Sequence, residues 1–150
     1  MDTQQQATTA SVTITRLVKA TPERVFAAWT TPEMMKQWNA PGDRTNPLVE
    51  VDLRVGGRYR IHMAAPDGRT SKVTGVYREV DAPHRLVYTW FWETNPALGE
   101  MLVTVEFRAR GDETEIVLVH ADCVSEEAAN NHRNGWLGAL PKLDLLLARA

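Results

Sequence analysis

Apolar and polar residues alternate with a period of two over most of the chain between Val12 and His120. This alternation is typical of strands that bury one face. Short segments rich in Gly, Pro, Asp and Asn separate the alternating stretches, and connections this short favour antiparallel neighbours. The pattern predicts seven strands, at about residues 12–18, 49–55, 59–63, 72–80, 86–92, 101–107 and 116–120, with Gly56-Gly57 as a tight turn.

Three segments have helical signals instead. Thr-Pro-Glu occurs at residues 21–23 and again at 31–33, and each predicts a helix start, because Thr caps, Pro fits the first helical position and Glu favours the positive dipole end. These two short helices are expected to bury Val25, Phe26 and Trp29, and Met34, Met35 and Trp38.

The last segment opens at Ser125, and apolar residues then recur at helical spacing: Trp136, Leu140, Leu143 and Leu147. Pro141 lies inside this helix. It is expected to break or kink the helix, because proline removes one backbone hydrogen bond and clashes with the preceding turn.

The order of strand, two helices, six strands and one long helix predicts an α+β fold. The short helices are too small to cover such a sheet, so the long C-terminal helix must lie across its concave face. A curved sheet and a straight helix leave space between them, which is a natural ligand cavity. Residues 1–11 are predicted to be a flexible tail, and residues 12–150 a single domain.

Composition restricts the kinds of partner and compartment that we expect for this protein. The net charge is −2 and no basic stripe is present, so a nucleic-acid partner is not expected. No stretch approaches the roughly 18 apolar residues of a membrane span. Cys123 is the single cysteine, which excludes an internal disulfide and favours a reducing compartment. The N-terminus lacks the pattern of a signal peptide, so we expect a cytoplasmic protein.

Several segments together resemble the Hsp90 ATPase activator homologue family, which belongs to the START-like, birch-allergen-like helix-grip superfamily (SRPBCC). The resemblance runs from about Val12 to the end. It is found in residues 14–16, 21–26, 29–33, 38, 51–59, 75–80, 85–90, 103–105 and 135–136, and in the leucine stripe of the last helix. It implies a helix-grip fold. It also implies a range of functions, since the superfamily includes lipid and steroid carriers, polyketide cyclases and aromatases.

Large flexible and aromatic side chains are the best functional signal. Tryptophan offers a flat surface with one N–H donor, and methionine adapts its shape to a ligand. The alternative for any one of them is a packed core. The predicted ligand-binding residues are Trp38, Met63, Trp90, Trp92, Met101, His120, Trp136 and Leu140.

Two polar residues fall on apolar strand faces. His120 is either a polar anchor or general base for a ligand, or a core histidine bonded to backbone. Arg16 either clamps a ligand carboxylate or phosphate, or pairs with an acid such as Glu79 or Glu106.

No metal site, cofactor or catalytic residue is predicted. His120, Asp122 and Cys123 lie close together, with His132 nearby, but their spacing matches no standard zinc pattern. Strict alternation would place Asp122 on the face of His120 and turn Cys123 away from it. Cys123 also lacks a defined base partner for nucleophilic chemistry.

The leading hypothesis is a non-catalytic domain, monomeric or homodimeric, that binds a small hydrophobic or aromatic molecule. The second is a chaperone-associated protein that binds through its surface. The third is an enzyme resembling polyketide cyclases or aromatases, with His120 or Arg16 as its polar group.

Overall fold

The computed structural model describes residues 9–149. The elements in chain order are β1 (Ala10–Val18), α1 (Pro22–Thr30), α2 (Pro32–Met35), β2 (Val49–Val51), β3 (Arg58–Ala64), β4 (Thr70–Asp81), β5 (Arg85–Trp92), the 3₁₀ helix η1 (Pro96–Leu98), β6 (Met101–Arg110), β7 (Glu113–Cys123) and α3 (Glu126–Leu147).

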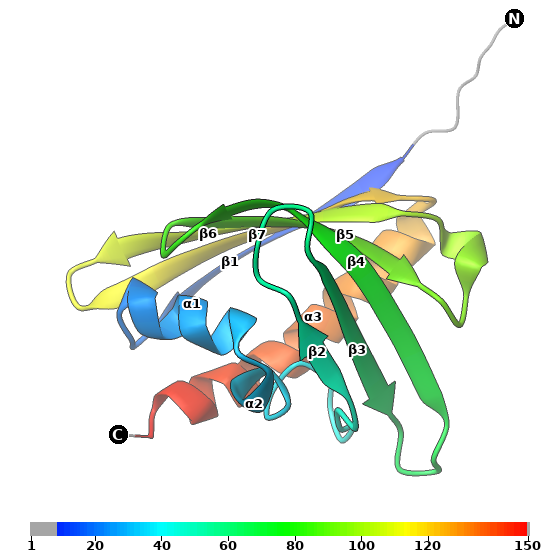
Figure 1. The fold of residues 1–150 in the computed structure, drawn as a ribbon, viewed down its shortest axis with the longest axis horizontal. Helices are drawn as coiled ribbons and strands as arrows, with labels where there is room; N and C mark the ends of the chain where they lie inside the picture. The colour runs from blue at the N-terminus through cyan, green and yellow to red at the C-terminus, as the bar shows by residue number, and fades with distance from the viewer. Residues whose placement is uncertain (1–8, 150) are drawn as a thin grey trace, which may run out of the picture.

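The seven strands form one sheet in the order β1-β7-β6-β5-β4-β3-β2, and every pair of neighbours is antiparallel. The sheet arches over α3, and α1 and α2 lie on the same side of the sheet as α3 (Figure 1). This arrangement confirms the predicted α+β helix-grip fold.

The core lies between the inner face of the sheet and the three helices. On β7 the inward residues Thr114, Ile116, Leu118 and His120 are all buried, while those between them are half-buried. Val25, Phe26 and Trp29 of α1 are buried, as predicted. The period of two therefore defines the buried face of the sheet along this strand.

The predicted second strand is too long. β2 ends at Val51, and Leu53 and Val55 are 39% and 64% exposed in the turn that follows. Only Gly56 of the Gly-Gly pair has a positive φ, +85°. Gly57 is required for a different reason, because a Cβ there would lie 2.0 Å from the backbone oxygen of Asp52.

Pro141 does not break the last helix. Helix α3 continues from Glu126 to Leu147, so the predicted break is wrong, and a kink within the continuous helix stays a prediction. Pro141 is exposed, whereas Leu140 and Leu143 are buried, so its ring is on the outer side of the helix. The carbonyl of Leu137 loses its helical donor, but Leu137 is 42% exposed and water can take the donor's place.

The N-terminal boundary shifts slightly. β1 begins at Ala10, so the last two residues of the predicted tail belong to the sheet, and residues 1–8 lie outside the described part. Between residues 9 and 149, none of the helices has the length and hydropathy needed to cross a bilayer.

Candidate functional site

A cavity of about 450 Å³ lies between the sheet and α3. Its walls come from four regions: the segment after α2, the strands β3 to β5, the turn that contains η1, and α3. The lining residues are Asn39, Ala40, Pro41, Arg44, Met63, Ser71, Trp90, Trp92, Thr94, Asn95, Leu98, Asn131, His132, Gly135, Trp136 and Ala139. The volume falls in the range of roughly 300–1,000 Å³ that is usual for small-molecule sites.

Half of the predicted ligand-binding residues line this cavity: Met63, Trp90, Trp92 and Trp136. The other four are fully or almost fully buried, and none of them is part of the cavity wall: Trp38, Met101, His120 and Leu140. The indole Nε1–H of Trp38 donates to the carbonyl oxygen of Ala28 at 2.9 Å, which gives this ring a structural role.

Three indoles meet at the inner end of the cavity. The Trp90 and Trp136 rings approach to 5.5 Å between centroids, and Trp92 packs edge-on against Trp90 at 5.6 Å. Indoles from β5 and α3 therefore meet across the cavity. Such tilted and edge-to-face geometries are favourable for aromatic pairs. Trp90 Nε1 is buried and has no hydrogen-bond partner among the described residues.

His120 lies behind Trp136. Its Nδ1 accepts a hydrogen bond from the Trp136 indole Nε1–H at 3.0 Å, and its Nε2 lies 3.3 Å from the sulfur of Met101. Burial, with a smaller contribution from nearby His132, lowers the pKa of His120 to about 3. Of the two alternatives, the side chain is therefore the neutral core histidine, but its partner is an indole and not the backbone group of that alternative.

His132 is a cavity residue that the sequence reasoning left out of the ligand-binding set. Its Nε2 accepts from the Trp92 indole Nε1–H at 2.9 Å, and its Nδ1–H donates to the carbonyl oxygen of Ala128 at 2.7 Å. Burial lowers its pKa below the ordinary value. The sequence does contain a signal for this position, because Ala128, His132 and Trp136 are spaced by four and share one helix face.

Cys123 points inward, so the predicted orientation is wrong. Val12 pairs with His120 and Ala10 with Cys123, which leaves two β7 residues opposite Ser11 alone. This is a β-bulge, and it includes Asp122 at φ +65°. The extra residue resets the alternation, so Cys123 returns to the inner face and Asp122 is exposed.

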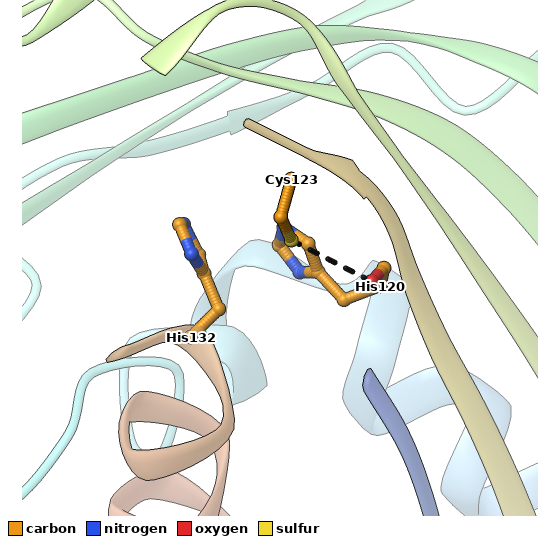
Figure 2. Close-up of side chains that lie close together, drawn as sticks. All are labelled: His120, Cys123 and His132. Carbon is orange, nitrogen blue, oxygen red and sulfur yellow. Dashed lines mark hydrogen bonds between the residues drawn. The ribbon is translucent and has the colours of Figure 1, made fainter. Parts of the chain in front are cut away.

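His120, Cys123 and His132 form a compact group, here called the histidine–cysteine cluster. One possible ligand atom from each lies within 4.8 Å of the others, and the two imidazole rings face each other (Figure 2). Both histidines, however, already accept an indole N–H. Burial raises the pKa of the Cys123 thiol, which favours its protonated form. On each imidazole a metal would have to displace either an indole donor or the proton of the other ring nitrogen, and on Cys123 the thiol proton, so the absence of a metal stays our prediction.

Arg16 has neither predicted acid as its partner. It forms a salt bridge with Asp144 of α3 at 2.5 Å, because β1 is the edge strand against which α3 packs. Glu79 and Glu106 instead pair with Arg85 on β5. Arg16 is not part of the cavity wall, whereas Arg44 is.

A curved antiparallel sheet that holds a long C-terminal helix over an aromatic-lined cavity defines a helix-grip domain of the START-like type. The sequence profile of the family "Activator of Hsp90 ATPase homolog 1-like protein" (AHSA1) matches residues 19–148. The chain therefore belongs to the AHSA1 family, as its sequence motifs had indicated.

Solved structures of similar proteins support this assignment. A protein from Chromobacterium violaceum is 25% identical with a TM-score of 0.85, over 93% of this chain and 98% of that one. The AHSA1 protein from Silicibacter pomeroyi is 26% identical with a TM-score of 0.83, over 93% and 98%. CalU16 from Micromonospora echinospora is 25% identical with a TM-score of 0.69, over 93% and 76%. No curated protein matches this sequence.

Proposed function

We propose that this protein binds a small, largely aromatic or hydrophobic molecule in the cavity between β5 and α3, without catalysing a reaction. The observation that carries the proposal is the cavity itself, which is built from three tryptophans and Met63 with a few polar groups among them. Such a lining suits a flat apolar ligand that is oriented by a small number of hydrogen bonds.

Gly135 gives independent support. It lies inside α3, where glycine costs roughly 1 kcal/mol relative to alanine. A Cβ added at Gly135 would meet nothing within 4 Å, so no packing contact requires glycine there. Gly135 lines the cavity, and its missing side chain leaves that space for a ligand.

Native mass spectrometry of protein purified from its own host tests the proposal. We expect the wild-type protein to retain a molecule of a few hundred daltons, in keeping with the cavity volume. Gly135→Phe places a ring in the open space and should abolish retention, whereas Gly135→Ala keeps most of the space and serves as the matched control. Retention that Gly135→Phe leaves unchanged would place the ligand elsewhere and overturn the proposal.

Family membership favours one second candidate, a chaperone-associated role. Such a role requires an exposed contact surface and no ligand. Isothermal titration calorimetry with an Hsp90 from the same host distinguishes the two functions. Binding through the surface should be unchanged in Gly135→Phe, whereas retention of a ligand in the cavity should be lost.

A further inference from the structure

We infer that the cavity is selective for aromatic acids, with Arg44 binding the carboxylate at the cavity wall. This inference rests on the proposed function and specifies the chemical class of the ligand. The walls contain one arginine and neither aspartate nor glutamate among the described lining residues. A negatively charged ligand therefore meets one fixed positive charge and no acidic side chain of the wall.

The Arg44 guanidinium has no acidic partner in the part of the chain that the structure describes. Within residues 9–149, no acidic side chain forms an ion pair with it. The pKa of Asp67 is lowered mainly by hydrogen bonds from the backbone N–H and the guanidinium of Arg69, which lies 2.9 Å away, and Arg44 adds only a smaller contribution. Arg44 is exposed, so its charge is accessible to a molecule that enters the cavity.

The backbone around Arg44 is fixed from two sides. Thr45 pairs with Ala64 of β3 through hydrogen bonds of 2.9 and 2.8 Å. The Lys142 ammonium of α3 donates to the carbonyl oxygens of Gly42 and Arg44 at 3.0 and 3.2 Å. An arginine presented from a fixed backbone loses less entropy when it binds a ligand.

Asn39 adds a polar group in the interior. The residue is part of the cavity wall although it is only 4% exposed. Its backbone oxygen accepts a hydrogen bond from the Asn46 side-chain amide at 3.0 Å, which holds this part of the segment in place. Arg44 and Asn39 lie on one segment, so the polar side of the ligand is expected to face this segment and its ring the tryptophans.

A matched pair of probes tests the inference: 2-naphthoate and 2-naphthamide, which share a ring system and differ in charge. Tryptophan emission of the full chain reports both titrations. We expect wild-type protein to bind the acid on the order of tenfold more tightly than the amide, which is typical of one hydrogen bond to a charged group. Arg44→Gln should remove this preference, so that the acid and the amide bind with similar affinity.

Arg133→Gln is the control, because it removes the same charge from an exposed position of α3 outside the cavity wall. Equal binding of the two probes by wild-type protein would overturn the inference while leaving the proposed function intact. An equal loss of acid binding in Arg133→Gln would also overturn it, since net charge would then explain the preference. Failure of both probes to bind would overturn the proposed function as well.

Discussion

Replacing Gly135 by alanine is expected to raise the free energy of unfolding by about 1 kcal/mol, the difference in helix propensity between the two residues. Nothing offsets this gain, because the added methyl group projects into open space. Gly138, one turn later in α3, behaves differently. A Cβ there would lie 3.1 Å from the Pro41 Cβ and 3.3 Å from the Gly42 nitrogen. The gain from helix propensity should be cancelled by this crowding, so Gly138→Ala is expected to lower the free energy of unfolding by up to about 1 kcal/mol.

Urea denaturation followed by circular dichroism measures both variants. For a domain of this size, 1 kcal/mol corresponds to about 2–4 °C in melting temperature, which a thermal scan resolves. Gly138 cannot relax easily, because the Gly42 N–H donates to its carbonyl oxygen at 3.2 Å. Equal stabilisation by the two substitutions would refute the reasoning, since helix propensity alone would then decide both.

Four further outcomes are expected. Trp92→Ala should weaken the binding of 2-naphthoate by roughly 1–3 kcal/mol, measured by fluorescence titration. Trp38 is fully buried outside the cavity wall, so Trp38→Ala should instead lower the free energy of unfolding by about 3–5 kcal/mol, measured by urea denaturation. Pro141→Ala should stabilise the protein by up to about 3 kcal/mol, because it restores the hydrogen bond to Leu137; no change in the denaturation midpoint would contradict this. His120 has a folded pKa of about 3 against an ordinary 6.5, so its contribution to stability is present above pH 6.5 and is lost as the pH falls, by up to about 2 kcal/mol at pH 5. His120→Gln should show a shallower acid slope in the same denaturation series, and an unchanged slope would count against this assignment. Dialysis against a chelator should leave the melting temperature unchanged, and a fall reversed by zinc would show that the histidine–cysteine cluster binds metal.

The fold could be predicted because its signals are local. Side-chain alternation marks seven strands, and two Thr-Pro-Glu starts with one apolar helical stripe mark the helices. The errors occur where a tertiary contact overrides the local pattern. Leu53 and Val55 continue the alternation in sequence, yet they lie in the turn that joins β2 to β3. Pro141 is tolerated because it is on the outer side of a helix whose buried side supplies the stabilising contacts.

The site could be predicted only in part, because cavity walls are made of residues far apart in sequence. Trp90, Trp92 and Trp136 could be found from periodicity, since each lies on the apolar face of a regular element. Arg44 could not be found in this way, because it belongs to an irregular segment that is placed by bonds to β3 and α3. Cys123 was misplaced because a single extra residue in β7 reverses the side-chain direction.

The attachment of the 41–45 segment to α3 has a kinetic consequence. Lys142 and the Gly42–Gly138 hydrogen bond join this rim of the cavity to the helix. The rim and the helix must therefore move together, and opening the cavity here would disturb the packing of α3 against β1. The opposite rim is the turn from Glu93 to Gly99. Among the hydrogen bonds of the described chain, only those with Lys72 join this turn to β4. This turn should therefore be displaced more easily than the 41–45 rim when a ligand enters or leaves the cavity.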